Sequence, residues 1–286
     1  MDRTEYYRSI VDRYMNLHQT KYAAGYQRNR FNTFNALLPP GERLRIFDFG
    51  CGSGENLISL ARKGHLVSGS DLSPEMLEKA RRNVMAAGLP ACDLRQGGVE
   101  ILDTLPPCCF DVVGALNVLP YLSEEEEQTF YMQAKRALRP GGSLIVSHTN
   151  ALVDLITFNR YTVEFWREQI IPYITDDAAE REVLAREFAA HLTRPHVPEK
   201  TASRRSERDV LPKRRINPMT YPAHLSSAYG LALQRISFTH YHPMPPQFME
   251  SSDKYRGYKL DFEERFRDNP LSYLFASIVL FRLTYS

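Results

Sequence analysis

Between Leu44 and His148 the sequence alternates short apolar runs with longer amphipathic segments. Such an alternation predicts strands joined by crossover helices, and hence a parallel sheet with helices on its faces. The fold class is therefore α/β. Five strands are expected in this part of the chain, at Leu44–Phe49, His65–Ser70, Ala91–Gln96, Phe110–Leu116 and Ser143–His148.

Helix signals stand between these strands. Ser73 followed by Pro74 predicts the start of one helix, and Gly88 with Pro90 predicts its end. Ser123 begins another helix, because its side chain can cap the helix while Glu126 reaches back to the cap N–H. The acidic run at 124–127 suits the positive end of the helix dipole, so we expect a solvated helix start rather than a metal site.

The alternation stops after Asn150 and returns at Leu231–Phe238 and Phe275–Thr284, where two more strands are expected. An insertion of this length between strands is more often a lid or substrate lobe than an idle loop. The sequence therefore predicts four parts. They are an N-terminal helical segment at 1–42, a core at 43–150, an inserted lobe at 151–229 and the last two strands of the core sheet at 230–286.

Composition narrows the class of protein. The chain carries 36 Lys and Arg against 34 Asp and Glu, and a net charge of +2 gives no argument for a polyanionic partner of the whole protein. No stretch approaches the roughly 18 uninterrupted apolar residues of a membrane span, so a cytoplasmic protein without membrane contact is expected. The cysteines lack metal-ligand spacing, and we interpret them as reduced and structural; they are Cys51, Cys92, Cys108 and Cys109.

A glycine-rich turn, Asp48-Phe49-Gly50-Cys51-Gly52-Ser53-Gly54, lies where the first strand ends and a helix begins. Glycine lets a ligand lie against the backbone and tolerates positive φ. The spacing of these glycines does not fit G-x-G-x-x-G, the fingerprint of a dinucleotide site such as that for NAD. No Gly-Lys-Ser/Thr follows, which excludes a P-loop. At the end of the next strand, Asp71 could accept hydrogen bonds from both hydroxyls of a ribose, or serve as a turn residue. Together the turn and Asp71 predict an adenosine site.

Four segments follow one another along the chain, namely Asp48–Gly54, Asp71–Met76, Phe110–Val113 and Leu138–Gly142. Taken in this order, they resemble the successive motifs of the class I, Rossmann-like, S-adenosylmethionine-dependent methyltransferases. The resemblance implies a doubly wound, mostly parallel seven-stranded sheet whose last strand is antiparallel. It also implies S-adenosyl-L-methionine as the cofactor, and the in-line transfer of a sulfonium methyl group requires no metal.

The same resemblance assigns cofactor contacts. Asp48, Gly50, Gly52 and Gly54 would surround the methionine part, Asp71 would hold the ribose, and Leu72 and Met76 would lie near the adenine. Further predicted contacts are Cys51, Asn56, Gly98, Val99, Glu100 and Leu116, with Tyr14 and Tyr22 from the N-terminal segment, where core packing is the equal alternative.

Two positions depart from the family pattern. Many relatives have Asp at the place of Gly98, so here the adenine amino group must meet backbone, Glu100 or water. Pro120 stands where His is frequent, which excludes a base at that position.

Methyl transfer to a nucleophile is an in-line displacement. The protein must exclude water, align donor and acceptor, and remove a proton where the acceptor is a hydroxyl or an ammonium. The ligand crevice of an open α/β sheet lies outside the carboxyl ends of its strands. We therefore predict His148 and His242 as candidate bases, each with a structural role as the alternative. The predicted positioning groups are Asn117, Asn150 and Tyr241.

The acceptor is the least constrained part of the prediction. Aromatic residues of the insertion favour a small molecule such as a sugar, a nucleotide sugar or a natural-product scaffold, although core packing explains them as well; they are Phe158, Tyr161, Phe165, Trp166 and Tyr173. The basic segment Arg194–Arg215 is either a solvated loop or a contact for an anionic acceptor or RNA.

RNA is the weaker of these options, because the segment has little aromatic interleaving for base stacking. Two alternatives stay open beside a small-molecule methyltransferase. One is a nucleic-acid methyltransferase that uses the basic segment, and the other is a non-catalytic protein that binds the cofactor. The sequence also leaves open a homodimer, the identity of the acceptor and the atom that is methylated.

Overall fold

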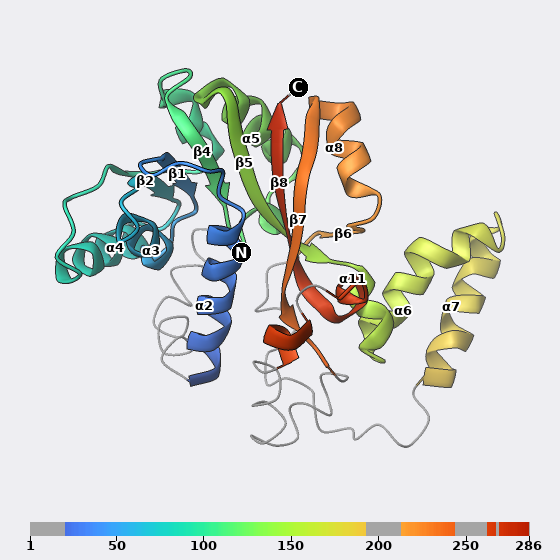
Figure 1. Cartoon of the computed structure of the whole chain (residues 1–286). Coiled ribbons are helices and arrows are strands. Elements are labelled where there is room, and N and C mark those ends of the chain that lie inside the picture. The colour runs from blue at the N-terminus through green and yellow to red at the C-terminus, as the bar shows by residue number, and fades with distance from the viewer. Residues whose placement is uncertain (1–20, 193–212, 244–261, 267–268, 286) are drawn as a thin grey trace.

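The computed structural model describes residues 21–192, 213–243, 262–266 and 269–285. Within these residues, eight strands form one sheet in the order β3-β2-β1-β4-β5-β8-β7, with the short β6 paired to β5 (Figure 1). The strands are β1 (Arg45–Phe49), β2 (Leu66–Asp71), β3 (Leu94–Gln96), β4 (Phe110–Ala115), β5 (Leu138–Asn150), β6 (Arg215–Ile216), β7 (Leu231–Tyr241) and β8 (Ala276–Tyr285).

The strand directions follow the expected pattern. Neighbours from β3 to β5 pair in parallel, whereas β8 runs antiparallel to both β5 and β7. The predicted doubly wound sheet with an antiparallel last strand is confirmed. β3 is shorter than expected, β5 begins earlier, at Leu138, and β6 was not predicted.

Helices cover both faces of the sheet. On one face lie α2 (Lys21–Ala36), α3 (Glu55–Ala61) and α4 (Pro74–Ala86), and on the other lie α5 (Glu124–Ala137) and α8 (Tyr221–Tyr229). Successive strand residues point to opposite faces. Ile46 thus belongs to the buried cluster that includes side chains of α2 and α3, and Phe47 to the cluster that includes side chains of α5 and α8.

The predicted caps are present. Ser73 Oγ accepts a hydrogen bond from the Met76 N–H at 3.2 Å, and Pro74 opens α4. At α5 the Glu126 N–H donates to Ser123 Oγ, and the Ser123 N–H donates to Glu126 Oε2, which completes a capping box. The acidic run that follows Ser123 is not solvated throughout, which corrects our expectation. Glu127 is only 6% exposed, because it falls on the face of α5 that meets β5 and α8.

The insertion after β5 contains η3 (Leu152–Ile156), α6 (Arg160–Phe165), η4 (Trp166–Ile170), η5 (Ile171–Tyr173) and α7 (Ala178–Leu192). Figure 1 shows α6 and α7 standing to one side of the sheet. The Trp166 ring packs on Phe188 with 4.9 Å between centroids, whereas Tyr173 is 92% exposed. Part of the aromatic content of the lobe therefore serves its own packing.

A short helix, α11 (Ser272–Phe275), precedes β8. Among the described residues, every helix is too short or too polar to span a lipid bilayer.

Asp111 anchors the edge of the sheet opposite the glycine-rich turn. Its carboxylate accepts a hydrogen bond from the Arg45 N–H at 2.6 Å and pairs with Arg139 Nε at 2.6 Å. The side chain of Asp111 is 8% exposed, and those of both arginines are about half exposed. The acidic residue of the Phe110–Val113 motif therefore joins β1, β4 and β5 and takes no part in the predicted ligand site.

We predict that Asp111→Asn lowers the free energy of unfolding by about 1–3 kcal/mol, because a buried carboxylate would lose its charge-assisted bonds. Urea unfolding measures this loss. Glu78→Gln is the matched control, since Glu78 meets Arg82 at 3.5 Å with both side chains well exposed, and it should change stability by no more than about 0.5 kcal/mol. Equal stability of the two variants would contradict the anchoring role of Asp111.

Candidate active site

The glycine-rich turn leaves β1 at its carboxyl end. Gly50, Gly52 and Gly54 have φ values of 73°, 54° and 85°, a region that favours glycine. A Cβ on Gly50 would lie 2.2 Å from Val118 Cγ2, whereas one on Gly52 would meet no atom within 4 Å. The turn is therefore packed tightly at Gly50 and open at Gly52, where a ligand can approach the backbone.

Asp71, at the end of β2, contacts this turn directly. Its Oδ2 accepts a hydrogen bond from the Gly52 N–H at 2.8 Å, and its Oδ1 accepts one from the Ser73 N–H at 2.9 Å. Burial raises the pKa of Asp71, while these backbone donors act to lower it. Each carboxylate oxygen has a second lone pair for a further donor. The turn and Asp71, predicted to act together, are neighbours in the fold.

A second carboxylate, Asp48, lies at the carboxyl end of β1 and is 2% exposed. Its Oδ2 accepts a hydrogen bond from Asn56 Nδ2 at 3.0 Å, and its Oδ1 is buried without a hydrogen-bond partner among the described residues. Burial raises the pKa of Asp48 to about 7, and the Arg30 guanidinium opposes this shift.

Arg30 itself is a residue that the sequence analysis missed. It belongs to α2, is 8% exposed, and has a buried Nε without a hydrogen-bond partner in the described part of the chain. The sequence feature that could have indicated Arg30 is its position one helical turn before Phe34, a residue that is fully buried. A cation on the buried side of a helix requires a polar counterpart.

The other predicted cofactor contacts differ in their exposure. Cys51 and Met76 are buried, and burial also raises the pKa of the Cys51 thiol. Leu72, Gly98 and Val99 are partly exposed, and exposed Glu100 folds back so that its Oε1 accepts the Gly98 N–H at 2.7 Å. Leu116 is buried at the end of β4. Tyr14 and the side chain of Tyr22 lie outside the described residues.

Two of the predicted positioning groups have their hydrogen-bonding capacity engaged inside the fold. Asn150 Nδ2 donates to the carbonyls of Tyr273 and Ala276, both at 2.7 Å, and its Oδ1 accepts the Leu152 N–H. The hydroxyl of fully buried Tyr241 donates to Ser272 Oγ at 2.9 Å. These contacts favour structural roles at the ends of β5 and β7.

Asn117, the third predicted positioning group, follows β4 and adopts a left-handed φ of 59°. Its N–H donates to Ser147 Oγ of β5 at 2.7 Å. Non-glycine residues in this conformation are uncommon and cluster at functional sites. The structure thus places Asn117 at the carboxyl edge, half-buried and held from the neighbouring strand.

The two candidate bases occupy different surroundings. His148 is 2% exposed, its Nε2 lies 3.3 Å from the Tyr131 hydroxyl, and its ring packs edge-on to Tyr221. Burial, with a contribution from Arg214, lowers the pKa of His148 to about 3. His242 follows β7, is only partly buried, and donates its backbone N–H to Phe275. β8 separates the strands from which these histidines come.

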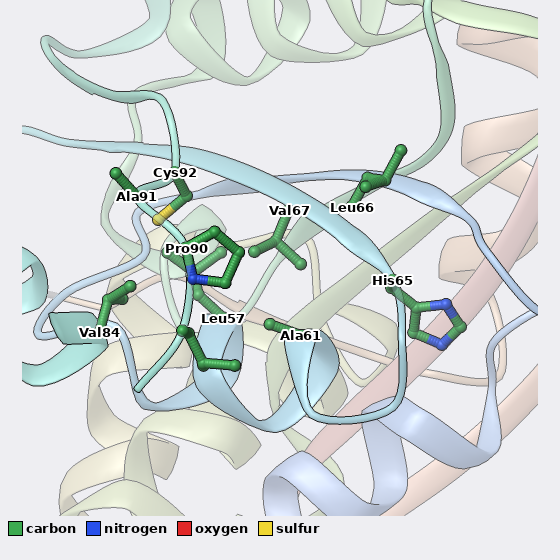
Figure 2. A pocket seen from close by; sticks show the side chains of 10 residues that line it. Leu57, Ala61, His65, Leu66, Val67, Val84, Pro90, Ala91 and Cys92 are labelled. Atoms are coloured by element: carbon green, nitrogen blue, oxygen red, sulfur yellow. The ribbon is translucent and has the colours of Figure 1, made fainter. Parts of the chain in front are cut away.

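An apolar cavity of about 240 Å³ lies apart from these residues (Figure 2). It is formed by α3, β2, the last turn of α4 and the segment that precedes β3, and Figure 2 shows side chains that line it. The lining residues are Leu57, Ala61, His65, Leu66, Val67, Val84, Leu89, Pro90, Ala91 and Cys92. Because none of the predicted site residues lines it, this cavity is separate from the candidate active site.

Comparison with known proteins places the glycine-rich turn and Asp71 inside a known domain. Residues 46–142 match the model of a family described as "Methyltransferase domain". The chain is 32% identical over 113 residues to a ubiquinone biosynthesis O-methyltransferase of Paracidovorax citrulli, covering 40% of this chain and 47% of that protein. It is 33% identical over 135 residues to an uncharacterized methyltransferase of Emericella nidulans, and this match covers 42% of this chain and 47% of that protein. The match spans about half the length of these curated relatives.

Solved structures share the fold. The chain matches magnesium protoporphyrin IX methyltransferase of Synechocystis PCC 6803, crystallised with bound SAH, at a TM-score of 0.55 and 16% identity over 99% of this chain and 97% of that one. It also matches a chain from the complex of the Haloferax volcanii Trm112 methyltransferase activator with a putative methyltransferase. That match has a TM-score of 0.57 and 16% identity and covers 99% of both chains. At these identities the likeness shows the fold alone. Residues 46–142 are thus similar to a methyltransferase domain, and the sheet around them has the fold of these methyltransferases.

Proposed function

We propose that the chain transfers the methyl group of S-adenosylmethionine to a hydroxyl group of a small molecule. The observation that carries this proposal is that Asp48 Oδ1 is buried without a hydrogen-bond partner among the described residues. This oxygen lies at the start of the glycine-rich turn, whose Gly52 N–H donates to Asp71. The name of the Paracidovorax citrulli relative, an O-methyltransferase, supports oxygen as the acceptor atom.

The residues present fit the chemical groups of this cofactor. An ammonium requires an acceptor such as Asp48 Oδ1, and a carboxylate requires a donor such as the Arg30 guanidinium. The hydroxyls of a ribose require an acceptor with spare lone pairs, which Asp71 supplies. Open backbone at Gly52 admits a ligand without a clash.

When bound, S-adenosylmethionine supplies an electrophilic methyl group on a sulfonium sulfur. The chain's own residues then have to orient the acceptor, exclude water and receive a proton from its hydroxyl. We assign orientation to Asn117 at the end of β4. We assign the proton to a ring nitrogen of His242, because the low pKa and enclosure of His148 make that ring a poor base.

The basic segment supports a small-molecule acceptor better than a nucleic acid. In its described part, Lys213 Nζ lies over the Tyr121 ring at 5.1 Å, Arg214 pairs with Glu127, and Arg215 pairs with Asp154. Cations committed to such contacts are poorly placed to bind a phosphate backbone. Residues 194–212 of this segment lie outside the described residues.

We predict that Asp71→Ala weakens binding of S-adenosylhomocysteine by about 10- to 150-fold, because roughly 1.5–3 kcal/mol of charge-assisted hydrogen bonding is lost. Titration calorimetry on the folded variant measures the change. Asp93→Ala removes a carboxylate that is exposed and pairs with Arg95 near the edge strand β3, so it should leave the affinity unchanged. Equal affinities of the two variants would rule out Asp71 as the ribose acceptor.

A second prediction concerns the pH dependence of stability without ligand. The pKa of Asp48 rises on folding from 3.8 to about 7, so the folded state binds this proton more tightly. The contribution of Asp48 to stability is therefore present below pH 3.8, is lost as the pH rises to about 7, and stays constant above it. Asp48→Asn removes this dependence.

The variant should thus gain stability relative to the parent protein by about 1–4 kcal/mol between pH 4 and pH 8. Urea unfolding across this range measures the gain, and calorimetry should show that the variant has lost affinity for S-adenosylhomocysteine. If the difference in stability between Asp48→Asn and the parent protein does not change with pH, folding does not raise the pKa of Asp48, and this carboxylate is already ionised at low pH in the fold.

The third prediction separates the two histidines. With a radiolabelled methyl donor and a panel of phenols and sugars, His242→Ala should lower single-turnover transfer by about 10²- to 10⁴-fold without a large loss of stability. His148→Ala should chiefly lower the melting temperature, because it opens a cavity in a buried network. Transfer by His242→Ala at the parental rate from pH 6 to pH 9 would instead favour catalysis by proximity alone.

A further inference from the structure

The segment 213–216 returns from the inserted lobe to the sheet beside the candidate active site. Arg215 and Ile216 pair with Thr149 and Asn150 of β5 as the short strand β6. On the other side of β5 lies β8, and β4 last pairs with β5 at Val146. β6 therefore takes the place beside β5 that β4 has left, next to the loop 117–121 that follows β4.

Arg214 connects this segment to two other elements. Its guanidinium pairs with the Glu127 carboxylate of α5, and its backbone N–H donates to the Pro120 carbonyl at 2.7 Å. Pro120 belongs to η2 (Leu119–Tyr121), at the far end of the loop from Asn117. The loop is thus held twice, by Ser147 at Asn117 and by Arg214 at Pro120.

Glu127 is the centre of a wider buried network. Its Oε1 accepts the Tyr221 hydroxyl at 2.5 Å, and the Tyr221 oxygen lies 3.3 Å from the Tyr131 oxygen. Tyr131 in turn contacts His148, whose Nε2 is 3.8 Å from Glu127. The network joins α5, α8, β5 and the returning segment, and its carboxylate side chain is only 8% exposed.

A buried ion pair is weak evidence for stability, because desolvation offsets the attraction between the charges. Apolar residues could pack α5 against α8 at a lower electrostatic cost. What a directional pair adds is a fixed position for Arg214, and through the N–H of that residue a fixed position for the loop 117–121.

We infer that Glu127 and Arg214 are positioning residues, which hold the loop 117–121 so that Asn117 meets the acceptor. This inference rests on the proposed function, since that proposal assigns the loop to the acceptor. The clamp consists of the Glu127–Arg214 pair and the bond from the Arg214 N–H to Pro120. It acts on acceptor alignment, because the hydrogen bonds of Gly52, Asp48 and Asp71 go to residues other than Glu127 and Arg214.

Hydrogen exchange of the ligand-free protein tests the clamp without any acceptor. Glu127→Gln and Arg214→Met should each raise exchange at the amides of residues 117–119, 121 and 213–217 by about tenfold, because each removes a charge-assisted contact. Arg214→Lys keeps the charge and should stay close to the parent. Glu125→Gln is the matched control, since Glu125 lies on the exposed side of the same helix.

Two further readouts separate the clamp from general loss of structure. Trp166 is the one tryptophan of the chain and packs in the lobe, so unchanged fluorescence shows that the lobe stays folded. Affinity for S-adenosylhomocysteine should stay within about twofold of the parent, while kcat/KM for an acceptor found in the panel falls by about tenfold or more. Arg214 is partly exposed, so its variants should fold even where Glu127→Gln does not.

Unchanged loop exchange in folded Glu127→Gln and Arg214→Met would overturn the clamp. A loss of cofactor affinity as large as the loss of transfer would also overturn it, because the pair would then support the whole site. A parent protein that binds no S-adenosylhomocysteine would refute the proposed function, while the exchange result would still decide whether the pair holds the loop.

Discussion

Burial of the sheet on both faces is the constraint on which the rest of this structure depends. Neighbouring residues such as Ile46 and Phe47, or Val112 and Val113, are all buried, although they point to opposite sides. A sheet filled in this way leaves polar chemistry only where its strands end. Asp48, Asp71 and Asn117 lie at the carboxyl ends of β1, β2 and β4, which are neighbours in the sheet. Asp111 lies at the opposite edge and holds strands together.

Local patterns could be predicted from the sequence because each depends on a few neighbouring residues. Ser73 with Pro74, and Ser123 with Glu126, determine where α4 and α5 begin. The glycine-rich turn needs positive φ at successive glycines, which the spacing itself reveals. The contact between the turn and Asp71 could also be anticipated, since parallel neighbouring strands bring their ends together.

Contacts between distant segments could not be found in this way. Glu127 looks like one more residue of an acidic helix start until Arg214, 87 positions away, is placed beside it. His148 was selected because it ends a strand, but strand alternation puts its ring with Leu144 and Val146 toward α5. Arg30 offered no motif at all, and only the packing of α2 against the sheet brings it into the surroundings of Asp48.

The pairing of β6 with β5 also bears on how such a protein could change over time. The lobe leaves the sheet at Ala151 and returns at Ile216, and the Ala151 N–H donates to the Ile216 carbonyl at 2.9 Å. Its two ends are therefore joined at their base, and the entropic cost of closing a loop grows only slowly with its length. A lobe attached in this manner can be lengthened, shortened or exchanged as a module while the sheet beneath it keeps its register.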